Sequence, residues 1–438
     1  MTKKVVAPCT PQEARGGIVP VAWLDFSSEQ RDLVLDALAE PKDKGTLDEL
    51  GFGTVRDAIA NRLFPAISTI QTRAKYLLFV PWIFKAVADG STSASRLRRE
   101  AENRERALIG ALIEGVSLKE RGLIGRESQE TLQRMPSSVY WGSLRQLKIF
   151  RGESSMAEYF REIESLRESK GKRYAGLQGD EDERQTDTHL AWDPALPEDH
   201  AVVEGKANFK LSSDEALYLA EKFLQLPTVP GQLGLLQWLA QDVEAGTFAS
   251  ANCPWDLLTF YGDAMPLALR RDLEHAWNFA LCVQGCNTAY YYFLLAQRGD
   301  EVDGCTTELE KWTDALASRA KQLQAWHQDI DGFWSWVAQV NPKLYRDKPF
   351  INFWLSHLAE TGFSLKGNSW LLKGDLKRRI KQREWDLKTD LARLSNLAPL
   401  KRWEAVDGAR IMNFRWDQAK QILTDIHQGV ARKEAANA

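Results

Sequence analysis

The sequence predicts a mainly α, multi-lobed, non-solenoid helical protein with few short strands. Its 438 residues exceed the length at which one hydrophobic core usually stops growing, so more than one lobe is expected. Apolar residues recur three and four positions apart over long stretches of the second half, which is the helical period. Strand signals are scarce, residues 410–414 being the best candidate, and no repeat of fixed period is evident.

The first helices can be placed by their start and stop signals. Residues 1–20 are rich in proline and glycine and predict an arm. Ser27 and Ser28 can cap a helix that Pro41 ends. A second helix is expected to end before Pro65. Ser68 or Thr69 can cap a third that runs to Pro81, so that residues 48–82 form two helices around a turn.

Further helices follow in both halves of the chain. Ser212 and Glu215 have the spacing of a capping box, which marks a helix start. Other helical patterns cover residues 95–113, 136–150, 254–260, 267–297, 306–340, 350–360 and 373–394. Because residues 171–205 are polar, acidic and contain prolines, they predict a linker or variable loop. The predicted divisions are an arm (1–20), an N-terminal helical domain (21–170), the linker (171–205) and a tryptophan-rich helical domain (206–438).

Composition narrows the class of protein. The N-terminus lacks the apolar core of a secretory signal, and no apolar run reaches the length of a membrane span. Five cysteines are too few and odd in number for a disulfide framework. We therefore expect a cytoplasmic protein with reduced thiols and no membrane partner. Its net charge of −3 means that any contact with nucleic acid must come from local clusters of basic residues.

A first basic cluster spans residues 62–99, where seven cations oppose one acid. If the helix after Ser68 presents Arg73 and Lys75 outward, these side chains are of the types that contact bases and phosphates from a recognition helix. The alternative is an amphipathic helix whose polar face is only solvated, with Tyr76 and Phe79 in the core.

A second basic cluster spans residues 373–402, where ten cations oppose four acids and tryptophans are interleaved. Basic side chains release counterions from phosphates, and an exposed indole can stack on an unpaired base. The residues expected to contact nucleic acid here are Lys377, Arg378, Arg379 and Trp385. The alternative is a helix held by its own ion pairs four residues apart, such as Glu384 with Lys388.

Tryptophan is unusually frequent, with 16 residues in the chain. Such a number indicates wide interfaces between helices or a surface that binds a partner protein.

Two motifs suggest metal chemistry, and each has a plainer explanation. His275, Cys282 and Cys286 share one helical face, but a single helix cannot close a tetrahedral zinc site, so buried core thiols are the favoured interpretation. Glu204, Gly205 and Lys206, with Asp193 or Asp199, resemble part of a metal-dependent nuclease site, which would need a sheet. No catalytic residue, metal or cofactor is assigned. Whether the protein is an enzyme stays open, with a non-catalytic role favoured.

Several blocks together resemble an uncharacterised bacterial family whose domain has no known function. They are WLDFS at 23–27, DELGFGTVRDAIANRLFP at 48–65, STIQTRAKYLLFVPWIF at 68–84, SSVYWGSLRQLKI at 137–149 and NFRWDQAKQILTDI at 413–426. The resemblance implies a prokaryotic cytoplasmic protein of the kind encoded among DNA-processing and anti-phage defence genes. We therefore expect an accessory or recognition subunit of such a system, which binds nucleic acid, with DNA favoured, or a protein partner, without catalysis. The alternatives are a metal-dependent nuclease and a protein-interaction scaffold.

Overall fold

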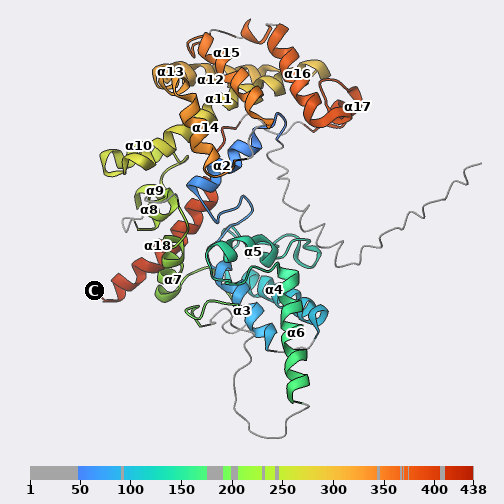
Figure 1. Cartoon of the computed structure of the whole chain (residues 1–438), viewed down its shortest axis with the longest axis vertical. Coiled ribbons are helices and arrows are strands. Elements are labelled where there is room, and N and C mark those ends of the chain that lie inside the picture. Colours follow the sequence, from blue (N-terminus) through green and yellow to red (C-terminus); the bar gives the residue numbers. More distant parts are fainter. Residues whose placement is uncertain are drawn as a thin grey trace, which may run out of the picture. The chain divides into compact units, whose positions relative to one another are not determined.

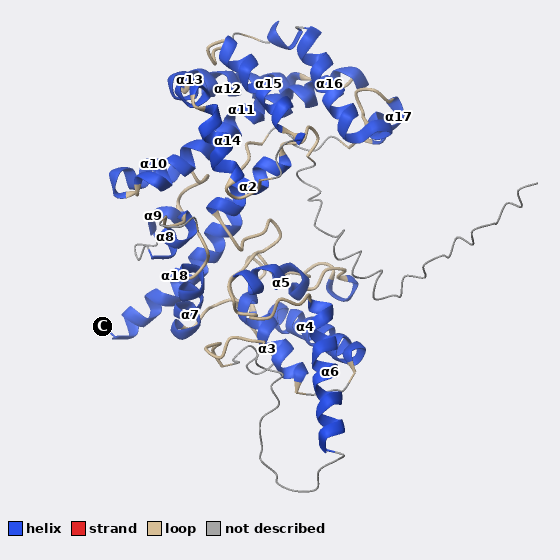
Figure 2. Cartoon of the chain, in the orientation of Figure 1, coloured by secondary structure: helices blue, strands red, loops and turns tan. Residues whose placement is uncertain are grey.

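The computed structural model describes residues 48–89, 93–174, 191–198, 206–228, 232–241, 246–342, 346–365, 367, 369–372, 374–404 and 410–437. The mainly α class is confirmed, since helices dominate and no β-strand forms among these residues (Figure 2). In particular, the strand predicted at 410–414 is wrong, because this segment is irregular and leads into the last helix. The predicted arm and the helix before Pro41 lie outside the described residues.

The first described helices are α2 (Gly53–Leu63), α3 (Tyr76–Ala88), α4 (Ala94–Gly115), α5 (Pro136–Gln146) and α6 (Met156–Tyr174) (Figure 1). The third predicted helix begins later than expected, at Tyr76, because the hydroxyl of Tyr140 accepts hydrogen bonds from the backbone N–H groups of Thr72 and Arg73 at 2.8 and 3.0 Å. It also continues past Pro81, which was expected to end it. Most of α3 is buried, and this packing compensates for the N–H that proline lacks.

An aromatic cluster fills the core between α3, α5 and α6. Phe84 stacks on Phe160 with ring centroids 5.1 Å apart, and the indole of Trp192 donates to the hydroxyl of Tyr159 at 2.9 Å. Trp192 also forms an isolated antiparallel bridge with Phe150. Residues 191–198 of the predicted linker therefore include core residues, whereas 175–190 and 199–205 lie outside the described part.

The middle of the chain forms α7 (Ser213–Leu224), α8 (Leu235–Gln241), α9 (Gly246–Ala249), α10 (Asp256–Tyr261) and the long α11 (Leu267–Arg298). The predicted capping box of α7 is confirmed, with Ser212 and Glu215 bonded reciprocally. Helix α11 is buried along much of its length. Gly285 makes this possible at one point, because a Cβ there would lie 2.1 Å from the indole of Trp312.

The pattern over residues 306–340 was predicted as one helix but forms three, which are α12 (Asp303–Ser318), α13 (Ala320–Gln328) and α14 (Ile330–Ala338). They are followed by α15 (Lys348–Glu360), α16 (Gly374–Lys388) and α17 (Leu397–Arg402). Helix α11 contacts α12, α13, α15, α16 and α17, so it is the common support of this region.

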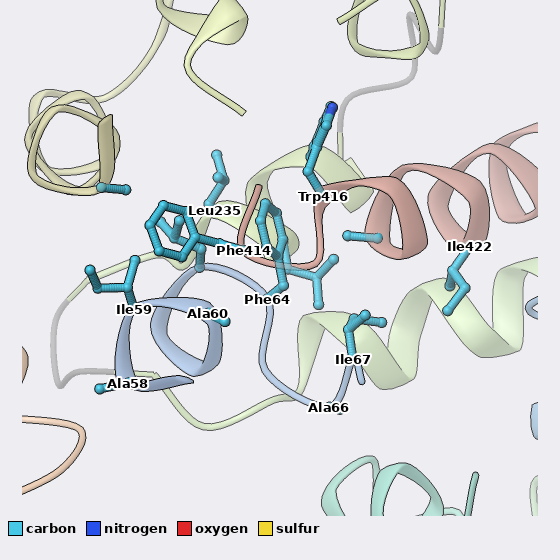
Figure 3. Packing of buried hydrophobic residues seen from close by; sticks show 14 of the residues in the cluster. Ala58, Ile59, Ala60, Phe64, Ala66, Ile67, Leu235, Phe414, Trp416 and Ile422 are labelled. Atoms are coloured by element: carbon cyan, nitrogen blue, oxygen red, sulfur yellow. The ribbon is translucent and has the colours of Figure 1, made fainter. Parts of the chain in front are cut away.

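The last helix, α18 (Trp416–Asn437), packs mainly against α7 and also against α8 and α9. Figure 3 shows how Phe64, after α2, meets Phe414 and Trp416 at the start of α18. The rings of Phe64 and Trp416 lie 5.7 Å apart, and the indole of Trp416 donates to the carbonyl of Ala251 at 3.1 Å. In the part of the chain described here, no helix has the length and apolar character needed to cross a membrane.

Candidate nucleic-acid interface on helix α16

Helix α16 has a buried face and an exposed face, both of which carry charge. Leu376, Ile380, Arg383 and Glu384 are buried, whereas the opposite face exposes cations, an amide and an indole. These exposed side chains are Lys377, Arg378, Arg379, Lys381, Gln382 and Trp385. The helix thus separates charges that hold it in place from charges that face solvent.

Arg383 anchors the buried face to the loop before α2. Its Nε donates to the carbonyl of Leu50 at 2.9 Å, and its Nη2 pairs with Asp347 at 2.5 Å. Gly51 lies directly against this guanidinium with a φ of +79°, and a Cβ there would come within 2.1 Å of Nη2. Only glycine fits that backbone and that contact without a shift.

Glu384 fixes the C-terminal end of α16. Its carboxylate is fully buried and accepts the backbone N–H groups of Arg393 and Leu394 at 2.8 and 2.9 Å, as well as the hydroxyl of Tyr290. Lys388 Nζ lies 3.7 Å from it, so the predicted ion pair four residues apart is present. Three hydrogen-bond donors therefore satisfy this buried carboxylate, and burial lowers the pKa of the neighbouring Lys388 to about 7.

Glu49 completes this buried network. It pairs with Lys388 and, at 2.7 Å, with Nη1 of Arg393. The expected pair of helices around a turn over residues 48–82 did not include a support of α16 by the segment from Asp48 to Gly53. No signal in the sequence joins Glu49 to Arg393, since the two are 344 positions apart.

The exposed face carries four cations and two acids. Arg378 pairs with Asp375, and Gln382 donates to Asp386 at 2.7 Å. Lys377 and Arg379 lie over the rings of Phe293 and Phe353, at 5.5 and 4.9 Å from their centroids. Aromatic faces hold these cations near the surface without neutralising them.

Trp385 lies on this face and is 39% exposed, the largest exposure of any tryptophan among the described residues. It is four positions from Lys381 and seven from Arg378, so one helical stripe carries an indole and two cations. Twelve other tryptophans of the described part are buried, and several donate their indole N–H to core carbonyls, as Trp312 does to Leu281 at 2.7 Å. Core packing therefore accounts for most of the tryptophan content.

Arg73 does not face outward, which the recognition-helix interpretation required. Its Nε is 2.9 Å from the carboxylate of Asp425, its Nη1 is 2.9 Å from Glu120, and its guanidinium lies 4.5 Å from the ring centroid of Phe209. Burial lowers the pKa of Arg73, but the two carboxylates outweigh burial and raise it. In turn, burial raises the pKa of Asp425 despite this partner.

Arg73 is half-buried, and Lys75 is buried, so neither projects from an exposed helical face. The Nζ of Lys75 lies 3.2 Å from Glu215 and donates to the carbonyl of Lys210 at 2.7 Å. The physical reason is the same for both residues. Because residues 72 and 73 bond to Tyr140 instead of forming a helix, their segment passes through a packed region and its cations meet buried acids.

The histidine and cysteine group is part of the core. Nδ1 of His275 accepts from the indole of Trp326 at 3.0 Å, and burial together with Arg271 and Arg62 lowers the pKa of His275 to about 4. Cys282 and Cys286 are fully buried, which raises the pKa of both thiols. The described residues include no group of three or more histidine, cysteine or acidic side chains arranged to hold a metal.

The nuclease-like motif is described only in part, since Glu204, Gly205 and Asp199 lie outside the described residues. Asp193 is buried and bonded to Arg151 at 2.8 Å, to Tyr218 at 3.2 Å and to Lys222. Burial alone would raise the pKa of Asp193, but the bond and charge of Lys222 outweigh it and lower the pKa. Both carboxylate oxygens of Asp193 therefore already take part in hydrogen bonds and ion pairs with neighbouring side chains.

Comparison with known proteins gives one match. The model of a family described as a family of unknown function (DUF6361) matches residues 18–429. Neither the curated proteins nor the solved structures contain a match to this chain.

Proposed function

The chain belongs to this family of unknown function, and we propose from the exposed face of α16 that it is an accessory subunit that binds nucleic acid without catalysis. The observation that carries the proposal is the row of exposed cations beside the exposed indole of Trp385. The buried charges of the same helix support it, because they fix the helix from the opposite side. Because the helix backbone is already fixed, only the cationic side chains lose conformational freedom when they bind phosphates.

The size of the charged face sets the strength of binding. Four cations can neutralise about four phosphates. The logarithm of affinity should therefore fall with the logarithm of salt concentration, with a slope of about −3.6 for duplex DNA and about −2.8 for a single strand. Such a face alone supports non-specific binding with a Kd on the order of 10⁻⁴ to 10⁻⁶ M. Affinity in this range suits a subunit that a larger complex holds near nucleic acid.

The resemblance of the sequence blocks adds a biological setting. We propose that this complex is a bacterial DNA-associated, anti-phage defence system and that DNA is the polymer. Affinity purification from the native host, with and without nuclease treatment, tests this proposal, because partners bound directly will survive nuclease treatment.

Fluorescence anisotropy with labelled DNA, over a range of about 50 to 200 mM salt, tests the proposed interface. A triple charge reversal removes the three exposed cations of α16 that have no carboxylate partner among the described residues: Lys377→Glu, Arg379→Glu and Lys381→Glu. A matched control reverses three exposed lysines elsewhere: Lys119→Glu, Lys210→Glu and Lys321→Glu.

The α16 variant is expected to bind at least about tenfold more weakly than the control, since both carry the same net charge. Equal affinities of the two variants would mean that α16 is not the interface. Binding that does not depend on salt would reject phosphate contact altogether.

A further inference from the structure

A cavity of about 470 Å³ opens where α2, α11, the end of α14 and the segment before α8 meet. A smaller cavity of about 230 Å³ shares four of its lining residues, which are Arg62, Gln232, Asp272 and Gln339. The larger volume lies within the range of pockets that bind small molecules, roughly 300 to 1,000 Å³. None of its lining residues belongs to α16.

Arg62 is fixed in the wall shared by the two cavities. Its Nε donates to Asp272 at 3.0 Å, and its guanidinium carbon lies 5.0 Å from the ring centroid of Trp336. The indole of Trp336 donates to the other oxygen of Asp272 at 2.6 Å. Asp272 therefore uses both oxygens within the wall, and Arg62 balances its charge.

The orientation of the surrounding carboxamides follows from the chemistry of arginine. Nη1 of Arg62 donates to Oε1 of Gln339 at 2.8 Å, and Nη2 donates to Oε1 of Gln232 at 3.3 Å. Asn61, which also lines the cavity, uses its Oδ1 to accept from Arg415 at 2.7 Å. Because arginine only donates, each amide must turn its oxygen toward the guanidinium.

As a result, the lining of the cavity is rich in hydrogen-bond donors. Within the described part of the chain, the NH₂ groups of the three carboxamides have no acceptor, and the bonds above use three of the five N–H groups of Arg62. Arg271 adds a second cation in the smaller cavity. Pro65, Pro227, Leu233 and Val340 supply an apolar wall.

We propose that this cavity binds a small organic anion, either a phosphate monoester or a carboxylate that carries a compact apolar group. The anionic oxygens accept from the amide NH₂ groups and from Arg62, while the apolar group lies against the proline and aliphatic side chains. Phosphates and carboxylates share the planar, multi-donor recognition that a guanidinium and amides provide.

Isothermal titration calorimetry on the full chain tests the site with three probes. Phenyl phosphate and benzoate represent the two anion classes, and phenol is the uncharged match. We expect at least one of the anions to bind and phenol not to bind, and the difference between the two anions identifies the class. Phenol binding as tightly as the anions, or no heat from either anion, would overturn the proposal.

Two substitutions remove donors while keeping the bonds to Arg62. In Gln232→Glu and Gln339→Glu, a carboxylate oxygen still accepts from the guanidinium, but the NH₂ group is lost and a negative charge is added. The double variant should bind the anion at least about tenfold more weakly. Gln328→Glu, at an exposed position of α13, makes the same chemical change away from the cavity and should bind normally.

Thermal denaturation of each variant shows whether it folds. If the double variant does not fold, Asn61→Asp makes the corresponding change at a single exposed position. Unchanged anion affinity in a folded cavity variant would reject this site. The α16 charge reversal should leave anion binding intact, so failure of the cavity proposal and failure of the nucleic-acid proposal give different results.

Discussion

At the scale of single residues, Glu105 gives a prediction about pH. Its carboxylate is buried and accepts from the N–H and hydroxyl of Ser137 at 2.6 and 2.9 Å, at the start of α5. Burial nevertheless raises the pKa of Glu105 from 4.5 to about 7. Between these values the folded state binds the proton more tightly than the unfolded state, so the contribution of Glu105 to stability falls as pH rises from about 4.5 to 7.

Glu105→Gln should remove this dependence, because an amide does not titrate. Its oxygen still accepts from the N–H of Ser137, and its NH₂ group donates to the Ser137 hydroxyl in place of the bond that the carboxylate accepted. Relative to the wild type, the variant should gain about 3 kcal/mol in free energy of unfolding between pH 4.5 and pH 8. Urea denaturation of both proteins across this range measures the difference. Parallel pH profiles would show that Glu105 titrates normally in the folded protein.

Arg73 shows what the sequence could not supply at this scale. An arginine suits a phosphate contact. Its carboxylate partner Asp425 is 352 positions away, so no local sequence pattern predicts the ion pair. Arg73→Ala should lower the free energy of unfolding by about 3 kcal/mol, because the buried Asp425 loses its ion-pair partner and keeps only the hydrogen bonds from the Ala74 N–H and from Gln421. The double variant with Asp425→Ala should recover part of that loss.

The same two variants test where nucleic acid binds. Chemical denaturation measures the stability of Arg73→Ala and the double variant, and anisotropy with labelled DNA measures affinity under folding conditions. We expect affinity to stay within about twofold of the wild type, since the side chain is engaged in the core. A large loss of affinity with unchanged stability would instead place Arg73 in the interface.

At the scale of elements, the loop from Asp48 to Gly53 supports α16. Gly51→Ala places a Cβ against Arg383 on a backbone with positive φ, and should cost about 2 kcal/mol or more. Gly110→Ala, in α4, meets open space and should instead stabilise the protein by about 0.5 to 1 kcal/mol. Denaturant unfolding compares the two, and hydrogen exchange of α16 amides should increase only in the Gly51 variant.

For helix α16, the sequence predicted the exposed residues but not the buried contacts. The basic and tryptophan pattern predicted Lys377, Arg378, Arg379 and Trp385 as candidates, and the structure places all four on one exposed side. The sequence pattern could not distinguish these exposed residues from the buried Arg383, which belongs to the same run of cations. That distinction depends on Asp347 and Leu50, which approach from elements remote in sequence.

At the scale of the whole molecule, periodicity was sufficient for the fold class because helical hydrogen bonds and apolar stripes are local. Element boundaries depended on tertiary contacts. Hydrogen bonds to Tyr140 keep residues 72 and 73 out of α3, and burial of α3 stabilises the helix beyond Pro81. The cavity around Arg62 could not be predicted, because α2, α11 and α14 each contribute only one or two of its polar groups.

The last helix connects distant parts of the chain, which leads to a prediction about cooperativity. Trp416 is fully buried between Phe64 and the carbonyl of Ala251, while Asp425, on the same helix, binds Arg73. Trp416→Ala should therefore cost about 3 to 5 kcal/mol. Because α18 packs against α7, α8 and α9, the loss should destabilise residues 48–437 as one unit.

Differential scanning calorimetry should show one main transition in the wild type, moved to lower temperature in Trp416→Ala. Trp385→Ala is the matched control, since this tryptophan is exposed and its removal should change stability by about 0.5 kcal/mol or less. A variant in which one transition moves while another stays in place would contradict a single unit. That result would support the predicted division into helical domains on either side of residues 171–205, because only independently folded lobes can respond separately to one buried side chain.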